Sequence, residues 1–360
     1  HQYFVTLGKA YRYTGDERYA EEFVRQVTHW IEANPYGIGI HWVSTMEVGI
    51  RLISWVNALA FMKDSAAVRS QAAEPLLRSL YQHALHLDAH LTTDWLVRTN
   101  HIIGETAGLF LFGALFPQFR RARRFRNKAL SIFTHEVLSQ TFLDGVNKEQ
   151  ATGYHRFVVD FVLLVLRVAD RNNITTPPAL RARLEKLLEY ELHLLGPDGR
   201  VPQIGDCDDG RGFIFSESVD FFDFRGWLAV GALWFDRDDF AAIGDANEEA
   251  LWFLGPDGWR QTKERARPAP ARASRLFPQG GQAILRAGDC PQGTCVHVRC
   301  GPFGLGGDGA SAHSHADLLS PVIHWRGRPL TVDAGTYAYY CDTAERDRFR
   351  STAMHNTLAP

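Results

Sequence analysis

Apolar residues recur three or four positions apart over residues 3–235, a spacing typical of helices that bury one face. Asp16 stands where it can cap the first clear helix, and Pro35, Pro117 and Pro177 fall between apolar segments, where helices break. The pattern predicts helices over residues 16–34, 46–62, 66–88, 101–115, 119–139, 147–171, 178–195 and 216–234. Helices in series with short links predict helical hairpins arranged as an incomplete α/α toroid.

The pattern changes at residues 265–274, where Pro, Ala and Arg occur without a hydrophobic period, as in a linker. Beyond this segment, short apolar runs and Gly-containing turns predict strands over 282–287, 295–300, 319–325 and 330–333. We therefore predict an α+β multidomain fold, with a helical domain over 1–264, the linker, and the start of an antiparallel β-sandwich over 275–360. The first residues resemble the middle of a helix and the last the middle of a strand. We expect both ends to be truncated, so that the β-sandwich is incomplete at the C-terminus.

Composition argues against several classes of protein. The 360 residues are 45% hydrophobic and 22% charged, as in ordinary globular proteins. A net charge of −2 provides no large cationic surface, which argues against a general nucleic-acid-binding protein. The sequence has neither a signal peptide at its start nor an apolar run of about 18 residues, so no membrane insertion is expected. The five cysteines match no zinc-ligand spacing and are predicted to be free thiols, with a Cys290–Cys295 disulfide as the alternative.

Two histidines one residue apart, His313 and His315, follow a loop rich in Gly, Ala and Ser and precede an apolar run. If that run is a strand, both side chains project from one face, because side chains alternate with a period of two. The pair can then share a metal ion, or divide the work between metal binding and proton transfer. Asp333 and His355 offer two more oxygen or nitrogen ligands further along the chain.

Several polar residues of the helical part are not needed for a plain core. Asn100 stands at a predicted helix start, where it is either a cap or a functional amide. Asn147 with Gln150 resembles a capping box and is interpreted as structural. The run Tyr154-His155-Arg156 is harder to explain by packing alone.

Two further groups have a plain structural interpretation. Glu47 and Arg51 lie four positions apart and are expected to form a surface ion pair worth roughly a few tenths of a kcal/mol. The acidic loop over 205–211 lacks the regular alternation and closing Glu of an EF-hand, so a solvated turn is its plain interpretation.

Together with the two-histidine loop, these groups resemble the heparinase II/III-like polysaccharide lyases, and the resemblance covers essentially the whole chain. The motifs that carry it, in the family's order, lie at 42–55, 100–109, 147–157, 205–211, 313–317, 332–337 and 349–357. The family's fold, an α/α toroid followed by an antiparallel β-sandwich, agrees with the pattern above. The resemblance implies an enzyme that cleaves uronic-acid polysaccharides by β-elimination and leaves an unsaturated uronate end. In having asparagine at position 100, the chain resembles the heparinase III and alginate-lyase branch of the family.

The resemblance also implies roles for individual residues. Asn100 would neutralise the uronate carboxylate, Tyr154 would be the tyrosine acid and base, and His313 the histidine base. Supporting or substrate-binding roles would fall to His101, Glu105, His155, Arg156, Arg211 and Arg350. His315, Asp333 and His355 match the family's structural zinc ligands, so that a Zn²⁺ ion would brace the loop that bears His313.

The expected partner is an acidic polysaccharide that is heparan sulfate-like, alginate-like or a bacterial exopolysaccharide. The near-neutral net charge favours a polymer with little or no sulfate. The alternative function is that of a non-catalytic glycan-binding or exopolysaccharide-biosynthesis relative of the same fold. A metal-dependent hydrolase is a third hypothesis, disfavoured because that chemistry needs neither Asn100 nor Tyr154. The family resemblance implies a periplasmic or secreted location.

Overall fold

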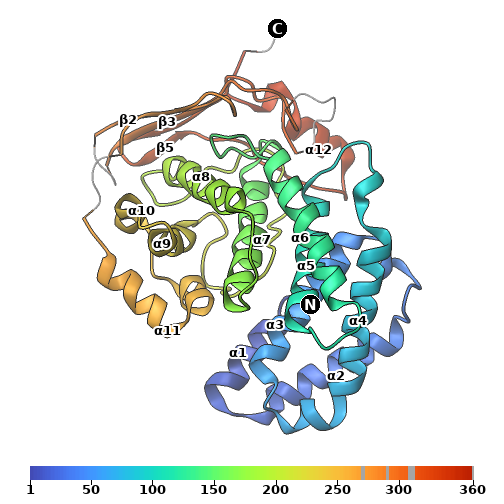
Figure 1. The fold of residues 1–360 in the computed structure, drawn as a ribbon. Coiled ribbons are helices and arrows are strands. Elements are labelled where there is room, and N and C mark those ends of the chain that lie inside the picture. The colour runs from blue at the N-terminus through green and yellow to red at the C-terminus, as the bar shows by residue number, and fades with distance from the viewer. Residues whose placement is uncertain (269–271, 289–291, 307–312, 359–360) are drawn as a thin grey trace. The chain divides into compact units, whose positions relative to one another are not determined.

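The computed structural model describes residues 1–268, 272–288, 292–306 and 313–358, and Figure 1 shows its ribbon. Most of the elements are helices, and the strands come near the C-terminus. The chain divides into two compact units: one holds residues 1–137, 160–177 and 212–215, and the other holds 138–159, 178–211 and 216–360. None of the helices in the described ranges combines the length and the apolar character needed to cross a bilayer.

The first unit is helical and is organised around a close contact between two helices. Its elements are α1 (Phe4–Thr14), α2 (Glu17–Ala33), α3 (Thr45–Met62), α4 (Ala73–His90), α5 (Asn100–Leu115), most of α6 (Ala122–Ser139), and α7 (Thr152–Arg171) from Asp160 onward, with short turns η1 (Ile40–Trp42), η2 (Val68–Ala72) and η3 (Thr92–Asp94). Helix α5 is buried on all sides from Ile102 to Ala114. A Cβ on Gly108 would lie 2.8 Å from the Cα of Gly49 on α3, so glycine is required where the two backbones meet.

The second unit combines helices with the sheet. It contains the first residues of α7, then α8 (Pro178–Leu194), α9 (Arg225–Trp234), α10 (Asp238–Ile243), α11 (Glu248–Arg265), β1 (Arg275–Phe277), β2 (Gln282–Ala287), β3 (Thr294–Arg299), β4 (Pro321–Trp325), β5 (Arg328–Thr331), α12 (Thr343–Arg350) and η4 (Thr352–Met354). The five strands form one antiparallel sheet in the order β1-β2-β3-β4-β5. Each strand therefore pairs with its neighbour in the sequence.

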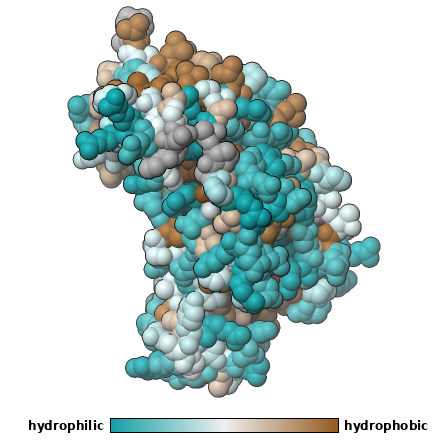
Figure 2. All heavy atoms as spheres, turned by 90° about the vertical axis from the view of Figure 1, so that its left-hand side faces the viewer, coloured by the Kyte–Doolittle hydropathy of each residue, from teal (hydrophilic) through white to brown (hydrophobic). Residues whose placement is uncertain are grey.

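The sheet buries one face and exposes apolar side chains on the other. Ile284 pairs with His297, which pairs with Val322, and all three are buried. The next row alternates outward, and its Leu285 is 47% exposed. Figure 2 shows hydrophobic side chains gathered at the upper end of one face, where Figure 1 draws the strands.

Helix α8 lies against the sheet within this unit (Figure 1). The rings of Tyr190 on α8 and Phe277 on β1 meet edge to face, with centroids 5.1 Å apart. Arg286 of β2 donates to the carbonyl of His193 at 2.6 Å, and Arg272 donates to that of Leu192 at 2.7 Å. Two guanidinium groups thus satisfy carbonyls at the C-terminus of α8, where the last turn has no helical partners of its own.

Several predicted boundaries differ from the structure. Helix α7 begins at Thr152 and not at Asn147, whose Oδ1 accepts from the Glu149 backbone 2.7 Å away in a preceding turn; it therefore does not cap the helix. The helix predicted over 216–234 begins at Arg225, and α10 and α11 were not predicted. Their pattern was obscured because α10 is only six residues long and α11 contains a non-helical Gly255 before Pro256.

The predicted Glu47–Arg51 surface pair is wrong. Arg51 is 8% exposed, and its guanidinium lies 4.4 Å from the centre of the Trp30 ring. Its Nε donates to His83 Nε2 at 2.8 Å. Burial lowers the pKa of Arg51 to about 10. Arg51 is therefore part of an aromatic core, where its charge is stabilised by ring faces as well as by hydrogen bonds.

The helices and strands separate where the sequence predicted, since α11 ends at Arg265 and β1 begins at Arg275. The compact units do not follow that boundary, because α8 to α11 belong to the same unit as the sheet. The domain limits 1–264, 265–274 and 275–360 stay a prediction. The proposed partner of Cys295 in a disulfide, Cys290, lies outside the described residues, so that alternative stays a prediction; Cys207, Cys300 and Cys341 are free thiols.

Candidate functional site

Tyr154 and His313 lie face to face in the second unit. Their ring centroids are 3.5 Å apart and their planes differ by 4°. Tyr154 belongs to the first turn of α7 and is 8% exposed, whereas the side chain of His313 is 17% exposed. His313 is not in a strand, so the predicted alternation of His313 and His315 along a strand is wrong.

Glycine at position 205 lets the segment around Asp206 reach this pair. Gly205 has φ of +72°, and a Cβ there would lie 2.7 Å from the carbonyl oxygen of His313 and 2.7 Å from the Cβ of Ala151. The next residue, Asp206, donates its backbone N–H to the same His313 carbonyl at 2.9 Å. Three segments that are far apart in the sequence therefore come so close together that only glycine fits at position 205.

A chain of hydrogen bonds joins the two rings through a second tyrosine. The Tyr154 hydroxyl lies 2.7 Å from that of Tyr339, and the Tyr339 hydroxyl lies 2.9 Å from His313 Nδ1. Burial, and then the neighbouring Tyr339, raise the pKa of Tyr154 well above its ordinary value. Burial also raises the pKa of Tyr339. Both phenols therefore keep their protons near neutral pH and can donate a hydrogen bond.

Asp206 lies at the centre of this part of the second unit. Its Oδ2 is 3.2 Å from His313 Nδ1, and its Oδ1 is 2.9 Å from His315 Nε2. Arg346 donates to Oδ2 at 3.2 Å, and Arg350 Nε lies 3.8 Å from Oδ1. Burial opposes ionisation of Asp206, but the hydrogen bonds from both histidines and the charge of Arg350 hold its pKa well below the usual range. Asp206 is therefore a buried carboxylate that is fully ionised at neutral pH.

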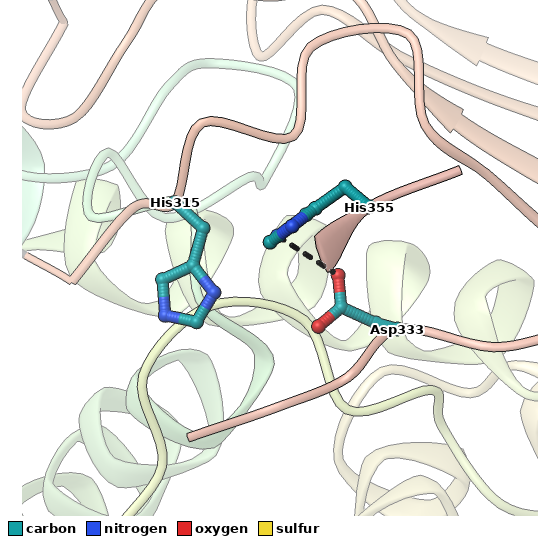
Figure 3. A group of neighbouring side chains, drawn as sticks. All are labelled: His315, Asp333 and His355. Atoms are coloured by element: carbon teal, nitrogen blue, oxygen red, sulfur yellow. Dashed lines mark ion pairs between the residues drawn. The ribbon is translucent and has the colours of Figure 1, made fainter. Parts of the chain in front are cut away.

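His315, Asp333 and His355 form a cluster that can hold a metal ion (Figure 3). One ligand atom from each lies within 4.8 Å of the others, and His355 Nε2 is 3.6 Å from Asp333 Oδ2. The second nitrogen of each ring is engaged: His355 Nδ1 with the carbonyl of Ser351 at 3.0 Å, and His315 Nε2 with Asp206. His315 Nδ1 and His355 Nε2 are buried without a hydrogen-bond partner in the described structure. Two imidazole nitrogens and a carboxylate held in this way fit Zn²⁺.

The residues predicted in the first unit gather at the start of α5. Asn100 is the first residue of α5 and is 1% exposed; the cap is Thr99, whose hydroxyl accepts from the backbone of His101. The interpretation of Asn100 as a cap is therefore wrong. The ring of His101 lies 5.5 Å from that of the half-exposed Trp95. Asn100 belongs to the other compact unit, so its convergence with Tyr154 and His313 stays a prediction.

Glu105 is fully buried in the same unit and supports the turn before α5. It accepts from the Thr45 hydroxyl at 2.6 Å and from the Thr92 backbone at 2.8 Å. Burial raises its pKa, although these bonds act in the opposite direction. A supporting role by hydrogen bonding is what this geometry allows.

The remaining predicted polar residues lie inside the second unit. Arg156 and Arg211 both donate to Glu249 Oε1, at 2.6 and 2.9 Å, and all three are buried. His155 is 1% exposed, and burial lowers its pKa to about 4. Arg350 donates to the carbonyl of Ser314 at 3.2 Å. These four predicted residues contact protein groups, which agrees with a supporting role, and a direct contact with substrate stays a prediction.

Sequence reasoning missed Tyr339 and did not assign Asp206 a role. Asp206 was part of a recognised motif, but a solvated turn explained its acidic loop equally well. Tyr339 stands in a run with Tyr337 and Tyr340, both of which are exposed. Nothing in the spacing of these tyrosines indicates which of them is turned inward.

The order of the elements, with helices first and an antiparallel sheet after them, defines the class of fold. A solved structure of heparinase III covers 100% of this chain with a TM-score of 0.80 and 22% identity, and the chain covers 54% of it. The predicted fold class, an α/α toroid followed by an antiparallel β domain, is thus confirmed. The match with heparan sulfate lyase from Pedobacter heparinus, in a mutant form, has a TM-score of 0.68 and 25% identity and covers 99% of this chain and 52% of that structure.

Two family models match the sequence: the heparinase II/III N-terminus over residues 1–223 and the heparinase II/III-like C-terminal model over 269–359. The chain therefore belongs to the heparinase II/III family. It is 25% identical over 367 residues to a heparin-sulfate lyase of Pedobacter heparinus, which covers 99% of this chain and 50% of the relative. It is also 25% identical over 377 residues to a heparin-sulfate lyase of Bacteroides thetaiotaomicron, with 100% and 50% covered. The chain spans about half the length of the curated relatives it matches.

Proposed function

We propose that this protein is a polysaccharide lyase that cleaves a uronic-acid-containing polysaccharide by β-elimination. The observation that carries the proposal is the stacked pair Tyr154 and His313, linked by the hydroxyl of Tyr339. A proton donor and a proton acceptor lie within the width of one sugar ring. The lyase names of the relatives support the same class of substrate.

β-Elimination at a uronate requires three functions. The carboxylate must be neutralised so that charge can develop at C5, a base must take the C5 proton, and an acid must protonate the departing O4. Each correctly placed acid or base contributes on the order of 10²–10⁴ in rate. A hydrolase would instead have to activate a water molecule, whereas β-elimination by these residues uses none.

Tyr154 is the proposed acid. Its raised pKa keeps the proton on Oη, and this proton can pass to O4 as the glycosidic bond breaks. His313 is the proposed base for the C5 proton. Its Nδ1 faces Tyr339 and Asp206, so Nε2, which lies 3.7 Å from Glu149 Oε2, is the nitrogen proposed to take the proton. After each turnover Tyr339 can return a proton to Tyr154 through their 2.7 Å contact and take one from Nδ1 of the protonated His313, 2.9 Å away, so that the proton taken from C5 replaces the one given to O4.

Asn100 is the proposed neutraliser of the uronate carboxylate. Its amide donates hydrogen bonds without bringing a charge of its own. It lies in the first turn of α5, where backbone N–H groups and the helix dipole also favour an anion. The proposal requires that this helix start and the Tyr154–His313 pair bind the same sugar.

A structural Zn²⁺ held by His315, Asp333 and His355 is part of the proposal. When bound, the ion would neutralise the Asp333 carboxylate and tie together the three segments that carry its ligands. By binding His315, it would hold in place the backbone two residues from the proposed base. The residues themselves carry out the proton transfers.

The substrate class can be tested with the purified protein and a panel of defined polymers. Heparan sulfate, heparin, alginate and unsulfated uronate polymers are incubated with the protein, and the ultraviolet absorbance of unsaturated uronate ends is followed. We expect absorbance to rise with at least one polymer and to be lost in Tyr154→Phe. Binding without any unsaturated product would instead support a non-catalytic glycan-binding relative, and saturated ends would support hydrolysis.

A further inference from the structure

The two oxygens of Asp206 bind two different histidines. Oδ1 lies 2.9 Å from His315 Nε2, and Oδ2 lies 3.2 Å from His313 Nδ1. His315 belongs to the metal-ligand cluster, whereas His313 stacks on Tyr154. One buried carboxylate therefore contacts both the metal cluster and the proposed proton-transfer pair.

The Asp206 carboxylate faces the guanidinium groups of Arg346 and Arg350, which can only donate, so it is the acceptor toward both histidines and determines where each carries its hydrogen. His315 must carry it on Nε2, and this leaves the lone pair on Nδ1. That atom is buried, has no hydrogen-bond partner among the described residues, and belongs to the residue that lies with Asp333 and His355. His313 faces Asp206 at hydrogen-bond distance through Nδ1, which therefore carries the hydrogen, and the lone pair is left on Nε2, 3.7 Å from Glu149 Oε2.

We propose that Asp206 is a positioning residue that fixes the tautomers of His315 and His313 together, so that one nitrogen is ready to bind metal and the other to accept a proton. Its effect on turnover rests on the lyase function proposed above, whereas its effect on the metal site does not. Asp206 is neither a member of the metal-ligand cluster nor one of the residues proposed to transfer a proton. It acts through the two histidines.

The surroundings of Asp206 hold its carboxylate in this orientation. Arg346 donates to Oδ2 at 3.2 Å, and the Arg346 guanidinium also lies 5.2 Å from the centre of the Tyr339 ring. Arg350 Nε is 3.8 Å from Oδ1. The backbone of Asp206 is tied to the His313 carbonyl, and Gly205 before it leaves no room for a side chain. Rotation of the carboxylate would break contacts on both sides at once.

The variant Asp206→Asn tests the proposal, because an amide presents one acceptor and one donor in the same shape. One of the two histidines must then face an N–H group and lose its partner or change tautomer. We expect the affinity for Zn²⁺ to fall about 10–100-fold, as when other groups that orient a metal-bound histidine are removed. We expect kcat to fall by on the order of 10² through misplacement of the base, with KM within about twofold. Asp209→Asn, an exposed change in the same loop, is the control and should leave both unchanged.

Nitrogen-15 NMR of labelled histidines in the metal-free wild-type protein gives a second readout that needs no activity and no variant. At a fixed neutral pH we expect His315 as the Nε2–H tautomer and His313 as the Nδ1–H tautomer, assigned with His315→Gln and His313→Gln. His315 found as the Nδ1–H tautomer would overturn the proposal, even if Asp206→Asn failed to fold. Unchanged Zn²⁺ affinity in a folded Asp206→Asn would overturn it as well. If the wild-type protein cleaves no polymer, the lyase function fails while the NMR and metal measurements still decide the role of Asp206.

Discussion

The ring of Tyr154 lies flat on the imidazole of His313, with 3.5 Å between their centroids and 4° between their planes. The two residues come from α7 and from the segment before β4. The hydroxyl of Tyr339 bridges them by hydrogen bonds, and of the two Asp206 binds His313 alone. Stacking fixes the planes of the two rings, and the hydrogen bonds fix how each ring is turned within its plane. Substitutions that remove a single hydroxyl group can therefore test the hydrogen bonds separately from the stacking.

Replacing Tyr154 with Phe keeps the stacked ring and removes only the hydroxyl. Because that hydroxyl is the proposed proton donor to O4, we expect kcat to fall by about 10²–10⁴ while polymer binding is retained. Initial rates of unsaturated product and binding of the same polymer measure the two effects. Tyr190→Phe, which removes a hydroxyl from another buried tyrosine of the same unit, is the control. An equal loss in both variants would argue against a specific role for Tyr154.

Tyr339→Phe interrupts the hydrogen-bond chain without touching the stacked pair. We expect a smaller loss of kcat, about fivefold, since one neutral hydrogen bond contributes roughly 1 kcal/mol. Tyr340→Phe is the matched control, because this neighbour is 84% exposed. If Tyr339→Phe has the activity of the wild type, the return of the proton through Tyr339 is not needed.

Removing the proposed Zn²⁺ should destabilise the second unit. An ion that binds only the folded state adds about 2.7 kcal/mol when its concentration is 100 times Kd. We expect a chelator to lower Tm, and Asp333→Asn to lower both the zinc content and the effect of the chelator. Asp347→Asn, at an exposed carboxylate on α12, should change neither. Thermal unfolding with and without chelator, with metal analysis of the same samples, provides the measurement.

Asn100→Asp should abolish turnover, because a carboxylate would face the uronate carboxylate that it is proposed to neutralise. Thr99→Ala removes the cap of α5 instead and should cost about 1 kcal/mol of stability with a much smaller effect on kcat. Comparison of denaturant unfolding with polymer cleavage separates the two effects. Full activity in Asn100→Asp would exclude the proposed neutralising role.

The stability of the second unit should fall in mild acid. Burial lowers the pKa of His155 and of His297 to about 4, below the ordinary value of 6.5. As the pH falls, these histidines are therefore protonated in the unfolded chain before they are protonated in the folded one. Their contribution to the stability of the fold is fully present above about pH 6.5 and is lost as the pH falls towards 4. The loss is on the order of 2 kcal/mol per histidine at pH 5.

Urea unfolding at pH 7.5 and pH 5 measures this loss. We expect His297→Gln to reduce the difference between the two pH values, whereas His29→Gln, at an exposed position of the first unit, should not change it. The same pH dependence in all three proteins would show that other groups are responsible.

The sequence alone determined the features that depend on neighbouring residues. Apolar spacing, Asp16 as a cap and short alternating runs predicted most helices and strands, because these signals lie within a few positions of each other. It also directed attention to His313, and the family resemblance singled out Tyr154 and the cluster of His315, Asp333 and His355, which the structure brings together.

Only the tertiary structure decided which polar groups meet. Asp206 is 107 positions from His313, and Tyr339 is 185 positions from Tyr154, so no local period connects them. Arg51, predicted at the surface, is buried because aromatic rings from other segments surround it. A buried charge is stable only where distant groups compensate it, and those groups are brought to it by the packing of the whole unit.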